Sequence, residues 1–329
     1  MTDLLKIINT QEQDYITITY FPTDICNFDC SYCFPGSHPG KFRYRDDVNF
    51  VIDNFRTLFN FYKNKFNKTK IYLEIAGGGE PTFWPHLVKF CTEIKKEHDA
   101  YIQLTCNGSR TVRWWKTIIP YIDEVLLSYH NEYTNIEHYI EVADLIWEND
   151  KKVNAMVLMD ALKWDKCVAD IETMKKSKYS WFINAKEVVT APGHDVESYS
   201  EEQLKFLDQP IKRLPTSDYI LKNLKDYRIV ESIAMYPDDK IVPANANYYL
   251  VNKLNYFTGW KCNVVSEKIT IFPSGKITGS CNVKFNADLN LYSEELSNDL
   301  KSIDMPYIIC DRDCCACQSD THITKWQSL

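Results

Sequence analysis

The residues best suited to chemistry in this sequence are cysteines, of which the chain has 12. Cys26, Cys30 and Cys33 have the spacing C-x3-C-x2-C and directly follow a short β-rich run. Three thiolates can hold one metal centre, but they do not complete the tetrahedral site of structural zinc. Thiolates are the usual ligands of iron–sulfur clusters, and three of them leave one iron of a [4Fe–4S] cluster open to a small molecule.

A second set of cysteines lies toward the C-terminus. Its members are Cys262, Cys281, Cys310, Cys314, Cys315 and Cys317. Cys262 precedes a predicted hairpin and Cys281 ends it, so the hairpin is expected to bring two thiols together. We expect a second metal centre on these two residues with Cys310, Cys315 and Cys317, or with Cys314 as an alternative ligand. Cys314 and Cys315 are adjacent, so both cannot comfortably bind one cluster. A structural zinc site is the competing hypothesis.

A glycine-rich segment, Ala76-Gly77-Gly78-Gly79-Glu80-Pro81-Thr82, follows the second predicted strand. Glycines allow a ligand to approach the backbone closely. The carboxylate of Glu80 could pair with an ammonium group. A glycine turn after a strand is often only a tight turn, so the segment gains meaning from its place one strand–helix unit after the first cysteines.

Strands and helices are predicted to alternate through the first 190 residues. The β-rich runs are Tyr15–Phe21, Ile71–Ala76, Tyr101–Cys106, Glu124–Tyr129, Val153–Met159 and Trp181–Val189. The segments between them carry apolar residues at three- and four-residue spacings, which favours helices. This alternation predicts an α/β fold with a parallel sheet, and six units would form a curved sheet or partial barrel. Such folds carry their chemistry at the carboxyl ends of the strands.

The two motifs together resemble the radical SAM superfamily, whose signature is C-x3-C-x-aromatic-C after the first strand and a GGEP-type motif after the second. Tyr32 fills the aromatic position. The resemblance covers about residues 15–189. It implies a partial (β/α)6 TIM-like barrel and a [4Fe–4S] cluster on the first three cysteines. It also implies S-adenosylmethionine (SAM) on the open iron, with Gly78, Gly79 and Glu80 at its methionine amino end.

Four further residues follow strands where the family often contacts SAM or the substrate. Asn107 follows the third strand, and Ser128 and His130 end the fourth, so the resemblance implies cofactor contacts for all three. Ordinary loop capping is an equally good interpretation. Cys106 ends the third strand and is a candidate hydrogen-atom donor to a substrate radical, although packing in the core is the favoured interpretation.

The C-terminal cysteines resemble the SPASM and twitch extensions of radical SAM enzymes. Six cysteines suit one auxiliary [4Fe–4S] cluster, so the shorter twitch type is the closer match. We therefore expect a barrel in residues 1–195, a connector in residues 196–255 and a twitch-like auxiliary cluster domain in residues 256–329. Lys268–Phe272 and Lys276–Ser280 around a Pro-Ser-Gly turn predict the hairpin of that domain.

Composition excludes several classes of protein. The hydrophobic share of 45% and the charged share of 25% are those of a globular chain. The net charge of −7 argues against nucleic acid as a partner. No apolar run approaches the ~20 residues of a membrane span, and no signal peptide is evident at the N-terminus. We therefore expect a cytoplasmic protein with no membrane partner.

The resemblance implies an enzyme that cleaves SAM reductively and abstracts hydrogen from a substrate carbon, as an oxidoreductase does. Its electron donor would be a protein such as flavodoxin or ferredoxin. Modification of a peptide or protein is the preferred substrate hypothesis. Oxidation or rearrangement of a carbohydrate or nucleotide is the alternative, and a zinc-binding structural or interaction protein is the hypothesis from another class.

Overall fold

The structure is a computed structural model. It describes residues 4–33, 39–179, 181–191, 195–196, 199–207, 232–237, 239–244, 248–249, 252–279, 285, 288–315 and 318–327. None of the helices in this described part of the chain has both the length and the apolar character that a membrane crossing requires.

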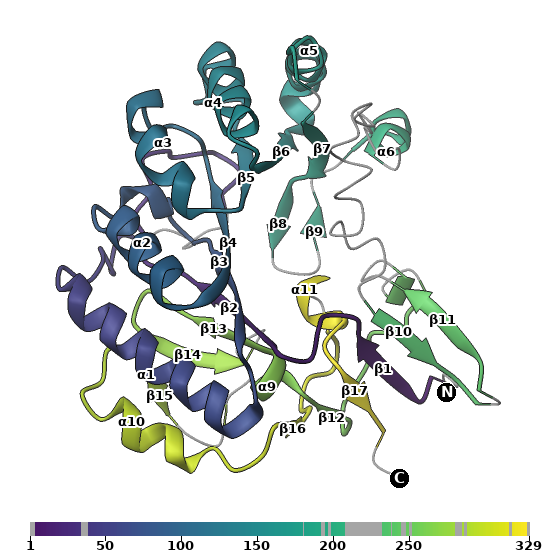
Figure 1. Ribbon diagram of the computed structural model, residues 1–329. Coiled ribbons are helices and arrows are strands. Elements are labelled where there is room, and N and C mark those ends of the chain that lie inside the picture. Colours follow the sequence, from purple (N-terminus) through teal and green to yellow (C-terminus); the bar gives the residue numbers. More distant parts are fainter. Residues whose placement is uncertain are drawn as a thin grey trace.

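A nine-stranded sheet with the order β15-β14-β13-β2-β3-β4-β5-β6-β7 forms the centre of the fold. Six of its strands come from the N-terminal part of the chain: β2 (Tyr15–Tyr20), β3 (Lys70–Ile75), β4 (Asp99–Cys106), β5 (Glu124–Tyr129), β6 (Lys152–Met159) and β7 (Phe182–Glu187). Each of these strands pairs with the next in parallel. The predicted α/β fold with a parallel sheet is therefore confirmed, and the sheet curves in the way expected of a partial barrel (Figure 1).

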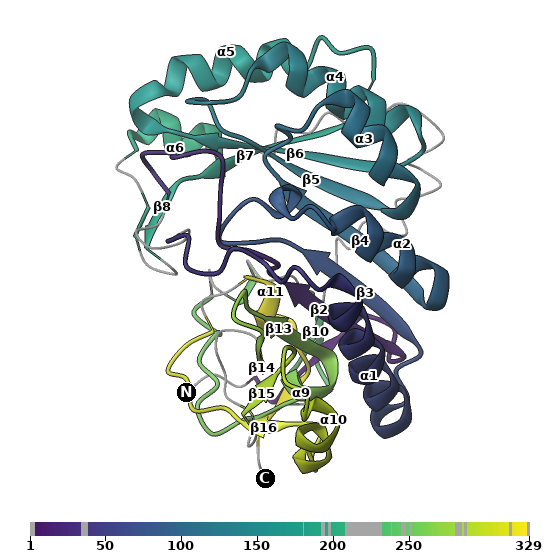
Figure 2. The same cartoon turned by 90° about the vertical axis from the view of Figure 1, so that its left-hand side faces the viewer.

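Helices connect the parallel strands and lie along one face of the sheet (Figure 2). They are α1 (Val48–Phe66), α2 (Leu87–Glu97), α3 (Val112–Ile118), α4 (Ile136–Glu148) and α5 (Trp164–Met174). Several begin with a side-chain cap: Asp47, Thr111 and Asn135 each accept a hydrogen bond from a backbone N–H in the first turn. Such caps satisfy donors that have no partner within the helix.

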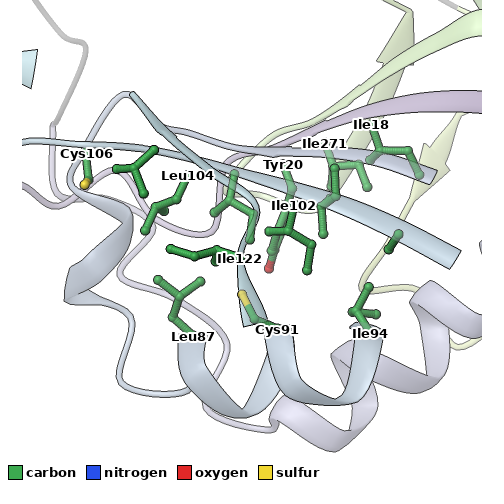
Figure 3. Packing of buried hydrophobic residues seen from close by; sticks show 14 of the residues in the cluster. Ile18, Tyr20, Leu87, Cys91, Ile94, Ile102, Leu104, Cys106, Ile122 and Ile271 are labelled. Carbon is green, nitrogen blue, oxygen red and sulfur yellow. The ribbon is translucent and has the colours of Figure 1, made fainter. Parts of the chain in front are cut away.

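The core lies between the sheet and these helices, because alternate residues of each strand point toward the helical layer. In β4 the buried residues are Ala100, Ile102, Leu104 and Cys106, while the residues between them are exposed or half-buried. Figure 3 shows Ile102 and Leu104 directed toward Leu87 and Ile94 of α2. The opposite face of the sheet is polar, and there Gln103 donates to the Tyr72 hydroxyl at 2.9 Å.

The C-terminal part of the chain completes the large sheet. The predicted hairpin is present as β13 (Lys268–Ile271) and β14 (Lys276–Gly279), followed by β15 (Leu289–Asn290). β13 pairs in parallel with β2, with Ile271 opposite Tyr20. The ammonium of Lys268 lies 3.2 Å from a carboxylate oxygen of Glu74 in β3, which ties the hairpin to the polar face of the barrel strands.

A second sheet has six strands in the order β11-β10-β1-β17-β12-β16. They are β11 (Ile241–Ala244), β10 (Ser232–Met235), β1 (Lys6–Asn9), β17 (Lys325–Trp326), β12 (Lys261–Cys262) and β16 (Ile308–Ile309). The N-terminal strand β1 pairs with both β10 and β17. The predicted domain boundaries near residues 195 and 255 stay a prediction. Two strands pair with partners on the other side of these boundaries: β1 with β10 and β17, and β13 with β2.

The remaining elements are short. They are β8 (Val189–Ala191), β9 (Asp195–Val196), α6 (Glu201–Leu207), α9 (Val264–Glu267), α10 (Leu296–Asp299) and α11 (Gln318–Thr321). Single 3-10 turns are η1 (Pro81–Phe83), η2 (Ile119–Tyr121), η3 (Ala161–Lys163) and η5 (Leu300–Ser302).

Aromatic side chains make up the centre of the core beside α1, and they generate a stability prediction. Phe55 is fully buried and its ring lies 5.1 Å from Tyr20 and 4.9 Å from Phe90, both in edge-to-face geometry. We expect Phe55→Ala to lower the free energy of unfolding by about 3–5 kcal/mol in urea titrations of the metal-free protein. Phe42→Ala, at a side chain that is 46% exposed, is the control and should change it by less than about 0.5 kcal/mol. Equal effects would contradict this account of the core.

Candidate active site

Four loops meet at one edge of the large sheet, because the carboxyl ends of parallel strands lie together. The loop after β2 carries Cys26, Cys30 and Cys33, which we call the cysteine loop (residues 24–33). The loop after β3 carries Gly77–Glu80, the loop after β4 carries Asn107, and the loop after β5 carries His130. Hydrogen bonds between these loops give the site its geometry.

The cysteine loop folds so that its three thiols are neighbours. A backbone hydrogen bond of 3.0 Å from Cys33 to Cys30 closes its last turn. The thiols are not joined as disulfides: each of the three is a free cysteine. Burial, together with the nearby charges of Cys26, Glu132 and Cys33, raises the pKa of Cys30 to about 12. Close thiols of this kind become thiolates when a metal binds them, since the cation supplies the compensating charge.

The cysteine loop supplies three free thiols as candidate metal ligands. Among the described residues, no three or more His, Cys, Asp or Glu side chains form a group arranged to hold a metal ion. The donor set itself, three thiols on one loop, fits three irons of a [4Fe–4S] cluster better than it fits zinc.

Gly79 brings the glycine loop against the cysteine loop, backbone to backbone. A Cβ at Gly79 would lie 2.3 Å from the carbonyl oxygen of Ile25, too close for any other residue. The next residue, Glu80, donates its N–H to the same carbonyl at 2.7 Å. The glycine is therefore required here by the close approach of two loops.

The Glu80 carboxylate is buried, with 2% of the residue exposed, and it accepts three hydrogen bonds from the protein. One oxygen accepts from the N–H and hydroxyl of Thr82, at 3.0 and 2.6 Å. The other accepts from the N–H of Asn107 at 2.7 Å. Burial raises the pKa of Glu80, and these hydrogen bonds and Arg110 oppose that effect. Glu80 thus ties the loops after β3 and β4 together, and its predicted contact with an ammonium group stays a prediction.

Asn107 links the loop after β4 to the cysteine loop. Its side-chain amide donates to the Asn27 side-chain oxygen at 2.9 Å, and its own side-chain oxygen accepts from the Ser109 N–H at 3.1 Å. Asn27 in turn donates to the Ser109 hydroxyl at 3.0 Å. These bonds are those of a loop-capping asparagine, and the predicted SAM contact of Asn107 stays a prediction.

His130 packs directly on the cysteine loop. Its Nδ1 lies 3.4 Å from the Cys30 sulfur and 3.2 Å from the Tyr32 hydroxyl, and its ring stacks on Tyr32 at 6.0 Å. Burial lowers the pKa of His130 to about 4, although nearby Glu132 opposes the effect. The imidazole is therefore neutral at pH 7 and contacts Cys30 and Tyr32 of the cysteine loop, and its predicted cofactor contact stays a prediction.

The sequence analysis missed two residues that form hydrogen bonds to the cysteine loop. The Glu132 carboxylate accepts from the Ser31 N–H at 2.8 Å and from its hydroxyl at 2.7 Å, and pairs with Lys163 at 2.6 Å. The Tyr133 hydroxyl donates to the Asp29 carbonyl at 2.8 Å. We call Glu132 and Tyr133 the clamp. Two polar residues in a loop after a strand are too common a pattern to have been singled out.

Ser128 and Cys106 occupy opposite faces of the sheet. Ser128 is half-buried and alternates with Leu127 and Tyr129, which belong to the core. Cys106 has the same parity in β4 as Ile102 and Leu104, is 4% exposed and belongs to the core cluster. Figure 3 shows its side chain on that side of the sheet. The expectation that Cys106 faces the substrate gains no support from this geometry, which gives the residue a packing role.

The C-terminal cysteines that the structure describes also lie together. Cys262 is on β12, and Cys310 donates its N–H to the Trp260 carbonyl at 2.8 Å. Cys315 donates its N–H to the Asn255 carbonyl at 2.8 Å, from the segment that leads into β12. Burial raises the pKa of Cys315 to about 12, with Cys262 and Cys310 among its charged neighbours.

Not all of the predicted second ligand set can be located. Cys281 and Cys317 lie outside the described residues. Cys314 is half-buried next to Cys315. The ligand set of a second centre therefore stays a prediction, now with three of its thiols known to be neighbours.

Comparison with known proteins shows which family the region of this site resembles. Residues 20–131 match the family model described as "Radical SAM superfamily". This range contains the cysteine loop, the glycine loop, Asn107 and His130. That part of the chain is therefore similar to radical SAM superfamily domains. Among curated proteins, no sequence matches the chain.

Solved structures with the same fold carry SAM. One, described as native anSMEcpe with bound AdoMet, is 15% identical, with a TM-score of 0.52 over 87% of this chain and 81% of that one. Another, described as native anSMEcpe with bound AdoMet and Kp18Cys peptide, is 15% identical, with a TM-score of 0.53 over 88% and 81%. At this level of identity the similarity establishes the fold.

The clamp leads to a prediction about the cysteine loop. Burial alone would raise the pKa of Glu132, but Lys163 and Ser31 lower it from 4.5 to about 2. The stabilisation that the ionised Glu132 carboxylate gives to the folded protein is therefore complete above about pH 4.5, and it is lost as the pH falls toward 2. In metal-free protein at pH 7, Glu132→Gln should speed hydrogen exchange of the Ser31 amide at least about tenfold, since one charge-assisted bond is worth about 1.5–3 kcal/mol.

The control is Glu148→Gln, which breaks a Glu–Lys pair of similar length (2.7 Å to Lys178) on an exposed surface elsewhere. It should leave exchange in residues 26–33 unchanged. Exchange at Ser31 that is equally fast in the wild type and in Glu132→Gln would show that the clamp does not hold the loop.

Proposed function

We propose that the chain is a radical SAM enzyme that binds a [4Fe–4S] cluster through Cys26, Cys30 and Cys33. The observation that carries the proposal is the cysteine loop itself: three neighbouring free thiols at the carboxyl edge of a parallel sheet, pressed against a glycine loop. The family match over residues 20–131 supports it. Three protein ligands leave the fourth iron open for SAM.

A [4Fe–4S] cluster held by Cys26, Cys30 and Cys33 would supply one-electron reductive cleavage of a C–S bond of SAM and, through it, abstraction of hydrogen from a substrate carbon. The chain's own contribution is to bind and orient. Gly78 and Gly79 offer backbone close to the cysteine loop for the methionine end of SAM. Glu80, Asn107 and the clamp hold the loops in place. Neutral His130 packs against Cys30 and Tyr32 and so covers the buried thiol of Cys30 from one side.

We further propose a second [4Fe–4S] cluster in the C-terminal part, with Cys262, Cys310 and Cys315 among its ligands. The backbone bonds that gather these three residues support the proposal. Such an extension would be of the twitch or SPASM type. One-electron reduction needs a donor protein, for which a flavodoxin or a ferredoxin is the natural candidate in a cytoplasmic setting.

The polar face of the large sheet is the natural substrate side, because the apolar face is covered by helices. Polar side chains line it in pairs, including half-buried Tyr101 with Glu124 at 3.0 Å and exposed Asn184 with half-buried Asn154 at 2.7 Å. Such a surface suits a substrate with many hydrogen-bonding groups, and we propose a peptide or protein. The solved structure with a bound peptide supports that class. A carbohydrate or nucleotide would also meet these groups, and a substrate screen with both classes decides between them.

Metal content tests the proposal directly. Anaerobically purified chain should contain about eight irons, as two [4Fe–4S] clusters require. Replacing Cys26, Cys30 and Cys33 together with Ala should leave about four irons and abolish formation of 5′-deoxyadenosine. Cys262→Ala with Cys310→Ala should also leave about four but retain SAM cleavage without substrate.

Three results would overturn parts of this proposal. Zinc in place of iron would replace it with a zinc-binding structural protein. About four irons in the wild type would remove the second cluster only. Formation of 5′-deoxyadenosine above background by the triple variant would mean that SAM is cleaved elsewhere.

Glu80 yields a separate prediction about SAM affinity. If its carboxylate faces the methionine ammonium as well as its three protein donors, Glu80→Gln should weaken SAM binding about tenfold to a hundredfold with iron content unchanged, since a charge-assisted contact is worth about 1.5–3 kcal/mol. Thr82→Val is the matched control, because it removes the hydroxyl donor to Glu80 but leaves the charge. Equal losses in both variants, measured by calorimetry, would assign Glu80 a loop-tying role alone.

A further inference from the structure

Lys325 is a buried cation, which is rare for lysine. It lies on β17 and is 1% exposed. Its ammonium donates to the backbone carbonyls of Asp320 at 2.6 Å, Ile323 at 3.0 Å and Thr321 at 3.4 Å. The ring of Phe257 lies 5.2 Å from the same nitrogen. These partners are neutral, and within the part of the chain that is described no ion pair joins Lys325 to a carboxylate.

Four groups that can carry a negative charge act on this ammonium: the thiols of Cys262 and Cys315 and the carboxyl groups of Asp320 and Glu267. β17 and β12 are antiparallel, and Lys325 stands directly opposite Cys262. Side chains of directly opposite residues project on the same face of a sheet. Burial lowers the pKa of Lys325, but the charges of Cys262, Cys315, Asp320 and Glu267 together outweigh this effect, so the net shift is upward. In return Lys325 opposes the burial that raises the pKa of both cysteines.

A buried ammonium is costly unless an anion compensates its charge. The carboxylates of Asp320 and Glu267 contribute to this compensation, whereas Cys262 and Cys315, whose pKa values burial raises, contribute only as thiolates. Metal binding produces that form, because cysteine binds a metal as thiolate. A cluster with inorganic sulfide and cysteine thiolates carries net negative charge, so that the ammonium and the cluster would stabilise each other.

We propose that Lys325 is the charge-compensating residue of an iron–sulfur centre at Cys262, Cys310 and Cys315, and that it raises the reduction potential of that centre. The inference rests on the second cluster proposed above. It assigns control of the reduction potential of that cluster to a residue that binds no iron. A fixed positive charge favours the reduced form, which holds one more electron. The centre is thereby tuned to accept an electron, as a substrate radical being oxidised would require.

The test is a redox titration of the full-length chain, monitored by electron paramagnetic resonance, in the Cys26, Cys30 and Cys33 to Ala background so that only the second centre contributes. Lys325→Gln keeps a donor for the carbonyls and removes the charge. We expect its midpoint potential to fall by at least about 59 mV, a tenfold change for one electron. Lys325→Arg, which keeps the charge, should stay close to the parent value.

The matched control is Lys68→Gln. Lys68 is also buried, at 8% exposed, and donates to the Gln13 carbonyl at 2.7 Å, but no C-terminal cysteine is among its charged neighbours. This variant should leave the potential unchanged. Iron content per chain is measured for every variant, so that loss of the centre is distinguished from a change in its potential.

Each possible result of this experiment either supports or overturns the inference about Lys325. An unchanged potential in Lys325→Gln with full iron content overturns the inference and leaves the second cluster standing. If the Gln variant loses its iron while Lys325→Arg retains it, charge compensation is supported; if both lose it, Lys325 has only a packing role and the inference is wrong. A parent chain without iron at the second set of cysteines overturns the inference and the second cluster together, whereas iron at the first set is unaffected.

Discussion

One buried carboxylate holds the candidate active site together. Glu80 accepts hydrogen bonds from its own loop and from the loop after β4, and its backbone N–H is bonded to the cysteine loop. Three loops from three strands are thereby fixed relative to one another. The close contact of Gly79 with Ile25 depends on that arrangement, and so does the placing of the thiols at the sheet edge. The clamp residues Glu132 and Tyr133 add a fourth loop from the other side.

Much of the barrel could be predicted from the sequence because its signals are local. All six predicted barrel strands are present within a few residues of their expected bounds. The patterns that predict them, β-rich runs for the strands and apolar residues at three- and four-residue spacings for the helices between them, can each be recognised within a short segment. The cysteine and glycine motifs also follow their strands as expected. The side of the sheet that Cys106 faces could have been predicted too, because it shares parity with Ile102 and Leu104.

What sequence reasoning missed depends on contacts between distant residues. β1 gains its strand partners from β10 and β17, more than 200 residues further along the chain. Glu132 acquires its role only because Ser31 lies opposite, and Lys325 only because β17 lies beside Cys262. None of these residues stands in a pattern that differs from an ordinary solvated loop or edge strand. Their importance is a property of the assembled sheets.

The parallel pairing of β13 with β2 has a consequence for how the protein is made. A ribosome releases β2 early and β13 only after most of the chain, so one edge of β2 has no partner throughout most of synthesis. An open strand edge is a template for pairing with other chains. The nascent barrel therefore cannot close its sheet on that side until Lys268–Ile271 emerge, and during that time the open edge of β2 exposes the chain to mispairing.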